Sequence, residues 1–179
     1  MRIVSGEYRG RVIHTPKNLP VRPTTDLAKE SLFNILNNRI DFEDVQVLDL
    51  FSGTGNISYE FISRGSSSVT SVEQNYQCHR FIKETAKKFQ MDGLKAVQAN
   101  AFSFLKHSLS YDIIFADPPY DFGRYEELTE LIITNKLLKE NGILIVEHPR
   151  DIHLSKFPSY FETRRYGRVH FSFFVNNIE

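Results

Sequence analysis

The sequence predicts an α/β protein with one mostly parallel sheet, and three observations support this prediction. Between residues 45 and 146, short runs of β-branched and aromatic residues alternate with helical patterns, and this βαβα order implies parallel strands. Residues 169–175 instead alternate with period two, which favours an antiparallel strand paired with residues 160–165 in a terminal hairpin. The length of 179 residues, 41% of them hydrophobic, suits one sizeable core.

The first predicted elements are an arm and a helix. Ile3-Val4 and Arg11-Val12-Ile13 are β-rich runs separated by glycines, and they predict a small hairpin or extended arm. Thr24-Thr25-Asp26 offers N-cap oxygens for a helix that continues to about Asn38. The buried stripe of this helix is predicted at Ala28, Leu32, Ile35 and Leu36.

The remaining elements follow in chain order. Predicted strands cover residues 45–50, 69–72, 96–98, 113–116 and 143–146, and Asn141-Gly142 forms the turn before the last of them. Predicted helices cover residues 57–64, 76–89, 101–107 and 125–134. We find no linker, internal repeat or low-complexity segment in the sequence.

The composition is typical of a soluble globular protein. No run of about 18 apolar residues could span a membrane, and the N-terminus lacks the apolar region of a signal peptide. A lone Cys78 cannot form an internal disulfide, which fits a reducing compartment. We therefore expect the protein to be cytoplasmic.

The charge is zero overall but unevenly distributed. Residues 1–22 hold five basic side chains and one acidic one, whereas residues 41–60 hold five acidic side chains and no basic one. A basic end on a neutral protein can bind phosphate groups. It can equally be an edge strand that its charges protect from further pairing, and charge alone does not separate these interpretations.

The segment Asp49–Gly55 lies where the first strand of the predicted sheet enters its helix. Its glycines allow a sharp turn and close approach to a ligand, although the third glycine of a dinucleotide fingerprint is replaced by Ser58. Glu73 lies 20 positions after Gly53, at the end of the second strand, where a carboxylate can bond ribose hydroxyls.

The acidic Asp49 distinguishes this segment from a simple dinucleotide site. A carboxylate there would repel a pyrophosphate, so a cationic ligand with a ribose, such as S-adenosylmethionine, is favoured. Structural alternatives are a turn or N-cap role for Asp49 and an exposed strand end for Glu73. The predicted cofactor contacts are Asp49, Phe51, Ser52, Gly53, Thr54, Gly55, Glu73 and Gln74.

Asn100, Ala101 and Phe102 follow the third strand. At this position an amide can bond the edge of an adenine and an aromatic ring can flank its face. Alternatively, Asn100 caps the short helix and Phe102 belongs to the core. Both interpretations can hold together, so we include the three residues among the predicted cofactor contacts.

Asp117-Pro118-Pro119-Tyr120 follows the strand Ile113–Ala116. Two successive prolines cannot continue a strand, so a carboxylate, a rigid backbone and an aromatic ring remain at its carboxyl end. A planar amine is a poor nucleophile, and acceptors for its N–H groups would help its nitrogen to pyramidalise. We predict that Asp117 and the Pro118 carbonyl hold such an amine and that Tyr120 stacks on its ring. The alternative is a turn that merely ends a strand.

Two further inferences concern His148 and metals. His148 ends the fifth strand, and we interpret it as structural or pocket-lining rather than as a base. No pattern of His, Cys or Asp residues has the spacing of metal ligands, so we expect no metal.

These segments together resemble the RsmD-type 16S ribosomal RNA guanine-N2 methyltransferases nearly from end to end. The donor loop and Asp-Pro-Pro-Tyr are shared by many amine methyltransferases, whereas the N-terminal arm and the Arg-Pro-Thr-Thr-Asp stretch are more specific. The matching segments are residues 2–6, 9–11, 22–26, 30–34, 47–55, 63–65, 72–73, 117–120, 146–148 and 165–167.

The resemblance implies a Rossmann-like class I methyltransferase fold with a seven-stranded sheet and an N-terminal hairpin. It implies methylation of a guanine N2 in 16S rRNA, within an assembling or assembled 30S subunit. We expect one domain, residues 1–179, in which an arm (1–25) precedes the S-adenosylmethionine-binding core (26–179), and we expect a monomer. The expected RNA contacts are Arg2, Arg9, Arg11, Arg22 and Thr24.

Two stretches depart from the family pattern. Of Leu27 and Lys29, which stand where the family often has arginine or lysine, Leu27 is not basic, and Ala99-Asn100 replaces the usual Gly-Asp. Alternative functions are a DNA adenine or cytosine amine methyltransferase, a protein glutamine N5-methyltransferase, and a nucleic-acid-binding module without activity. The short chain leaves little room for a DNA-reading domain, Asn would be more typical than Asp117 in a glutamine methyltransferase, and intact donor and acceptor motifs disfavour an inactive module.

Overall fold

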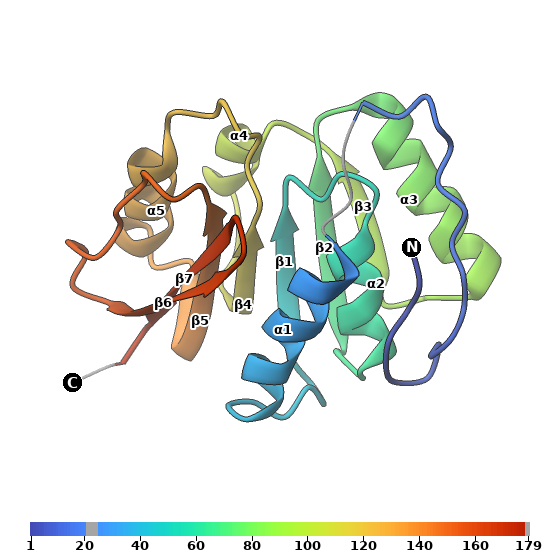
Figure 1. The fold of residues 1–179 in the computed structure, drawn as a ribbon, viewed down its shortest axis with the longest axis horizontal. Helices are drawn as coiled ribbons and strands as arrows, with labels where there is room; N and C mark the ends of the chain where they lie inside the picture. Colours follow the sequence, from blue (N-terminus) through green and yellow to red (C-terminus); the bar gives the residue numbers. More distant parts are fainter. Residues whose placement is uncertain (21–24, 178–179) are drawn as a thin grey trace.

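The fold is a twisted seven-stranded sheet with helices on both faces, seen in a computed structural model that describes residues 1–20 and 25–177 (Figure 1). The strand order is β3-β2-β1-β4-β5-β7-β6, and β7 alone runs opposite to the other strands of the sheet. The strands are β1 (Gln46–Leu50), β2 (Ser68–Glu73), β3 (Leu94–Gln98), β4 (Tyr111–Ala116), β5 (Leu138–His148), β6 (Tyr160–Tyr166) and β7 (Val169–Val175). The predicted α/β class and terminal hairpin are therefore confirmed.

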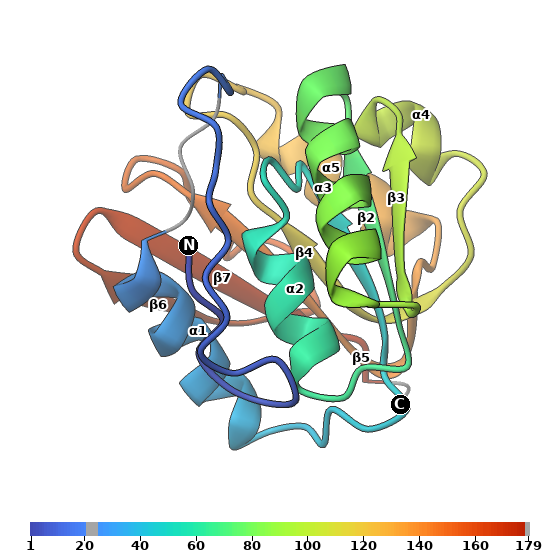
Figure 2. The same ribbon diagram turned by 90° about the vertical axis from the view of Figure 1, so that its right-hand side faces the viewer.

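The helices form a layer on each face of the sheet (Figures 1 and 2). One face is covered by α1 (Asp26–Asn37), α2 (Asn56–Ser63) and α3 (Tyr76–Phe89), whose apolar side chains share a core cluster with the side chains of Val47, Ile113 and Ile145. The other face is covered by α4 (Ala101–Leu105) and α5 (Tyr125–Thr134), which pack on the alternate strand residues. This two-sided burial explains why the central strands are continuous apolar runs.

The predicted elements are all present, and most of their bounds lie within two residues of the prediction. Strand β5 begins at Leu138, well before the predicted residue 143, because the chain continues through Asn141 with a left-handed φ of 58° and a register irregularity instead of a separating turn. Helix α4 ends at Leu105, shortly before the predicted residue 107. In α1, Ile35 is half-buried, whereas Phe33 is fully buried.

The N-terminal residues form the predicted arm. An isolated antiparallel bridge joins Arg2 to Val12, and the Ile3 N–H donates to the Arg11 carbonyl at 3.0 Å. The arm lies against α2, where the N–H groups of Val4 and Ser5 each donate to the Glu60 carboxylate at 3.0 Å. Because Ile3, Tyr8 and Ile13 are buried in the same cluster as α1 and α2, the arm is part of the core.

Gly6 is required for this close packing. Its φ is +83°, and a Cβ at this position would lie 1.6 Å from the Ser63 carbonyl oxygen. Any side chain here would push the arm away from α2.

Lys29 ties the arm to two helices. Its Nζ donates to the Arg2 carbonyl oxygen at 2.6 Å and to Asn56 Oδ1 at 2.9 Å, and it lies 3.5 Å from Glu60 Oε2. The side chain is 1% exposed. Lys29 therefore stands where the family often has a basic residue but serves a buried ion-pair network.

Candidate active site

Three carboxylates gather at the carboxyl ends of the central strands. In the sheet register Asp49 lies beside Phe115, and Ala116 lies beside Val146, so Asp117 and Glu147 directly follow a register pair. Side chains alternate between the faces of a strand. Since Val47, Phe115 and Ile145 pack in the cluster of α1, α2 and α3, we infer that the three acids lie toward this same side of the sheet.

Asp49 is buried at the end of β1. The Ser58 hydroxyl donates to its Oδ2 at 2.5 Å, and the N-cap of α2 is Gly55, so the N-cap alternative for Asp49 is wrong. Burial raises the Asp49 pKa to about 7; the Ser58 hydrogen bond opposes this rise, and the charges of Asp117 and Glu73 add to it. Ser58, which replaces the third glycine of a dinucleotide fingerprint, thus hydrogen-bonds to the buried carboxylate of Asp49.

Glu73 organises the loop after β1. The Gly53 N–H donates to its Oε2 at 2.8 Å and the Asn75 N–H to its Oε1 at 2.7 Å. In the same loop the Ser52 hydroxyl donates to the Asp49 carbonyl oxygen at 2.7 Å. Glu73 is thus a half-buried, hydrogen-bonded group rather than a free strand end. Each of its oxygens keeps a second lone pair for another donor.

The loop reaches α2 through two tightly fitted residues. Gly55 has a φ of +82°, and a Cβ there would lie 2.8 Å from the ring carbon Cζ of Tyr59, so this position requires glycine. Thr54 is buried, and its hydroxyl contacts Met1 Sδ at 3.1 Å, which joins the loop to the arm.

The segment after β3 confirms the N-cap interpretation. Asn100 Oδ1 accepts from the N–H groups of Phe102 and Ser103 at 3.0 and 3.3 Å, while its Nδ2 donates to Gln74 Oε1 at 3.0 Å. Ala101 is buried. The side chain of Asn100 is exposed, so its predicted contact with adenine stays a prediction that this geometry permits.

Phe102 belongs to an aromatic group that sequence reasoning missed in part. Its half-buried ring stacks on Phe122 with centroids 5.9 Å apart, and Phe122 also meets Phe51 edge-on at 5.2 Å. The Arg124 guanidinium lies 3.9 Å from the Phe102 ring centroid. In the sequence, Phe122 and Arg124 could have been noticed because they shortly follow Asp117–Tyr120, in the loop between β4 and α5.

The backbone carbonyl of Pro119 stabilises the turn that contains Asp117–Tyr120. The carbonyl of Pro119 accepts from the Phe122 N–H at 2.9 Å and from the Tyr125 hydroxyl at 3.2 Å. Tyr120 is 86% exposed, so stacking on a base needs an incoming ligand. Burial raises the pKa of the half-buried Asp117 to about 7. Pro118 is buried beside it.

Glu147 is a residue of this edge to which sequence reasoning assigned no role. Burial raises its pKa to about 9, and the charge of Asp117 contributes in the same direction. Its Oε2 is buried and has no hydrogen-bond partner in the part of the chain that the structure describes. In the sequence, Glu147 could have been noticed as an acidic residue at the carboxyl end of an apolar strand, where open α/β sheets bind their ligands.

His148 has the structural role that the sequence indicated. It is buried, its Nε2 lies 2.7 Å from Ser172 Oγ, and its Nδ1 lies 2.9 Å from the Pro149 carbonyl oxygen. Burial lowers its pKa. Both ring nitrogens therefore serve β7 and the local chain instead of a substrate.

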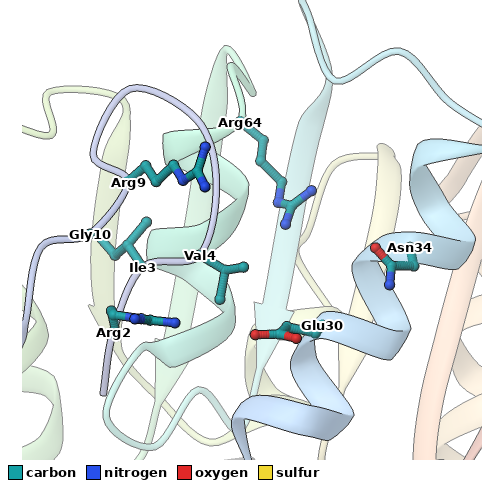
Figure 3. Close-up of a pocket in the computed structure, with 8 residues that line it drawn as sticks. All are labelled: Arg2, Ile3, Val4, Arg9, Gly10, Glu30, Asn34 and Arg64. Atoms are coloured by element: carbon teal, nitrogen blue, oxygen red, sulfur yellow. The ribbon is translucent and has the colours of Figure 1, made fainter.

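The basic residues of the arm divide into two groups. Arg2 and Arg9 line a cavity of about 340 Å³ between the arm and α1, together with Arg64 and Glu30 (Figure 3). Arg11 lies instead over the rings of Tyr8 and Phe89, at 4.9 and 5.1 Å from their centroids. The other two expected RNA contacts, Arg22 and Thr24, lie outside the described residues.

The described residues contain neither a group of side chains arranged as a metal site nor a membrane-spanning helix. No group of three or more His, Cys, Asp and Glu side chains in residues 1–20 and 25–177 is arranged to hold a metal ion. No helix in the described part of the chain is both long and apolar enough to cross a membrane.

Comparisons with known proteins place this geometry in a family. A family model described as "Conserved hypothetical protein 95" matches residues 1–175. "Ribosomal RNA small subunit methyltransferase D" of Buchnera aphidicola is 30% identical over 98% of this chain and 92% of its own length. The protein of the same name from Escherichia coli K12 is 31% identical over 92% of this chain and 83% of its own length. A solved structure, "Putative methyltransferase yhhF from Escherichia coli", has a TM-score of 0.87 at 27% identity and covers 100% of this chain and 99% of that one.

The sheet, the donor-type loop and the acidic strand ends define a class I, Rossmann-like methyltransferase, the class that uses S-adenosylmethionine. The chain belongs to the family described as conserved hypothetical protein 95, to which the RsmD-type proteins belong. The resemblance stated from the sequence is therefore confirmed.

Proposed function

We propose that this protein methylates the exocyclic N2 amine of a guanine in 16S ribosomal RNA, with S-adenosylmethionine as the methyl donor. The observation that carries the proposal is the Asp117 carboxylate, which follows β4 at the same sheet edge as Asp49 in a chain about 30% identical to small-subunit rRNA methyltransferases over nearly its whole length. Each part of this site has a task in such a transfer.

The donor side fits S-adenosylmethionine. The buried Asp49 carboxylate and the open lone pairs of Glu73 suit the positive charges and the ribose of this molecule, and the turn at Gly53 and Gly55 brings backbone close to it. Phe51, Ser52, Thr54, Gln74, Asn100, Ala101 and Phe102 complete the proposed contacts. The donor supplies an electrophilic methyl group, and the chain supplies its position.

The acceptor side would prepare the amine. Asp117 accepts one N2–H of the guanine and the Pro118 carbonyl accepts the other, which frees the nitrogen lone pair from the ring. As the bond from N2 to the methyl carbon would form, the carbon–sulfur bond of the donor would break and S-adenosylhomocysteine would leave, while Asp117 would hold the proton that N2 releases. A carboxylate whose pKa is about 7 is suited to both tasks. Tyr120, already exposed, stacks on the base, and Pro119 keeps the turn rigid.

The arm would bind the RNA. Arg2 and Arg9 are exposed and line one cavity, while Arg11 remains exposed beside aromatic rings. Guanidinium groups on such a surface neutralise phosphates and position a large substrate without reading its sequence. Arg22 and Thr24, which lie outside the described residues, complete the proposed RNA contacts.

We also propose the setting in which the enzyme acts. The arm (1–25) and the core (26–179) would work as one methyltransferase domain, since buried arm residues share the cluster of α1 and α2. The substrate would be an assembling or assembled 30S particle, and the enzyme would act as a monomer in the cytoplasm. The similarity to proteins named as small-subunit rRNA methyltransferases supports ribosomal RNA as the substrate in this setting.

A transfer assay tests the proposal. Purified protein and labelled S-adenosylmethionine are incubated in parallel with 30S particles, naked 16S rRNA, duplex DNA and a translation release factor. Label should enter rRNA, and mass spectrometry of the digested RNA should find N2-methylguanosine at one position. Label in DNA or protein but in neither form of rRNA would refute the proposal.

A further inference from the structure

The carboxylate of Glu147 is the next acid after Asp117 along the sheet edge. Because Ala116 and Val146 are register partners, Asp117 and Glu147 occupy matching positions at the ends of β4 and β5. The charge of Asp117 contributes to the raised pKa of Glu147, as expected for groups at neighbouring strand ends. The pKa of Tyr125, whose hydroxyl donates to the Pro119 carbonyl, is raised by burial and by the charges of both acids.

Glu147 differs from the donor-side acids in its hydrogen bonding. Asp49 accepts from Ser58, and Glu73 accepts from two backbone N–H groups. Glu147 Oε2 is buried without a hydrogen-bond partner among residues 1–20 and 25–177. A buried acceptor without a donor destabilises a fold, so its presence beside Asp117 needs an explanation. A ligand that brings its own donor to this point would provide one.

Guanine carries the matching donors. Its N2 amine stands beside a protonated ring nitrogen, N1–H, so its pairing edge presents two neighbouring donors. Adenine and cytosine instead place an unprotonated ring nitrogen beside their amine. Because its pKa is about 9, the Glu147 carboxyl is neutral at neutral pH and offers one accepting oxygen and one O–H donor. It can accept N1–H of guanine and donate to the neighbouring O6, whereas a bare ring nitrogen beside the amine, as in adenine, takes only the O–H. The group therefore favours guanine by one hydrogen bond.

We propose that Glu147 is a specificity-determining residue, which accepts the N1–H of the target guanine while Asp117 accepts an N–H of its N2 amine. This proposal rests on the proposed function and adds the way in which the base is chosen. Two acceptors on neighbouring strands, which hydrogen-bond to two neighbouring donors, also fix the orientation of the base, so N2 is the atom presented for transfer.

The test compares guanine with 2-aminopurine at the modified position. 2-Aminopurine keeps the amine but its N1 carries no proton. After the modified position is mapped, 16S rRNA with either base there is made by splinted ligation and assembled into 30S particles. The measured quantity is the ratio of kcat/KM for guanine to that for 2-aminopurine. The wild-type protein should prefer guanine at least about tenfold.

The variant Glu147→Leu should lower this ratio about tenfold or more, because it removes both the acceptor for N1–H and the donor for O6. Glu147→Gln, which is neutral like the protonated acid and keeps one acceptor and one donor, should retain the ratio. Glu140→Leu serves as the matched control, since Glu140 is exposed on the same strand. Thermal unfolding and calorimetry with S-adenosylmethionine verify that each variant is folded and binds the donor.

The outcomes separate the two proposals. If the wild-type protein methylates guanine N2 but Glu147→Leu leaves the ratio unchanged, the specificity role is refuted and the proposed function stands, whether both rates fall together or neither falls. If the wild-type protein places no methyl group on any guanine N2, the proposed function fails first. A lowered ratio in Glu147→Leu but not in Glu140→Leu or Glu147→Gln supports the role.

Discussion

The donor side and the acceptor side of this site are built in opposite ways. On the donor side, Glu73 and Asp49 accept hydrogen bonds from Gly53, Asn75 and Ser58, so the loop is held before any ligand arrives. On the acceptor side, Glu147 keeps a buried oxygen that has no hydrogen-bond partner among the described residues. The difference teaches that the proposed donor side is preorganised by the chain, whereas in our proposal the acceptor side is completed by its substrate.

The largest expected effect is on turnover, at Asp117. Asp117→Ala removes the group that holds the amine and takes its proton, so kcat should fall about 10²–10⁴-fold. Donor binding should change little, because Glu73 and the loop are untouched. Single-turnover kinetics and calorimetry measure the two quantities. Asp92→Ala, an exposed change near the opposite end of the sheet, is the control. Full activity of Asp117→Ala would remove the acceptor side from the mechanism.

The second effect is on the pH dependence of stability, at Glu147. Its folded pKa of about 9 lies above its ordinary value of 4.5, so its contribution is complete below about pH 4.5 and is lost as the pH rises through about 9. Asp49 and Asp117, with pKa values of about 7, act in the same direction.

Glu147→Gln stays neutral and should therefore exceed the wild type in unfolding free energy by about 1–3 kcal/mol at pH 9, with a smaller difference at pH 5. Urea unfolding of both proteins at pH 5, 7 and 9 measures this, with Glu140→Gln as control. If the unfolding free energies of the wild type and Glu147→Gln changed with pH in parallel, burial of the Glu147 carboxyl would not destabilise the fold.

A smaller effect is expected on the donor side. Glu73→Gln removes a charged acceptor from two backbone N–H groups and from the proposed ribose contact, so the Kd for S-adenosylmethionine should rise about tenfold. The kcat at saturating donor and the choice between guanine and 2-aminopurine should be retained. Calorimetry gives the Kd. If Glu73→Gln instead altered base choice, the two sides would not be separate.

The smallest expected effect is on RNA binding, at two arginines of the arm that belong to neither the donor side nor the acceptor side. Arg9→Ala and Arg11→Ala should each weaken RNA binding and lower the slope of log affinity against log salt by about 1. Arg11→Ala should also lower the unfolding free energy by about 0.5–1 kcal/mol, because its guanidinium lies over Tyr8 and Phe89. Filter binding at several salt concentrations measures the slope, and an unchanged slope would return the arm to a structural role.

The sequence by itself determined the sheet class, the order of the elements and the position of the donor loop. These depend on local patterns: apolar runs of strand length, glycine at the loop after β1, and two prolines that must end a strand after Ala116. Tyr76–Phe89 and Tyr125–Thr134 even have their predicted bounds, and the start of the first carries a local signal, the Asn75 N-cap.

Tertiary structure alone decided which polar residues face the site. The buried network of Lys29 and the packing of Phe122 on Phe102 depend on segments that meet after folding. The same is true of the pair Asp117 and Glu147, which are 30 positions apart in the chain but follow one register pair in the sheet. A one-dimensional pattern records what each strand end carries, whereas the register of the sheet decides which of these groups share an environment, and hence which pKa values are shifted.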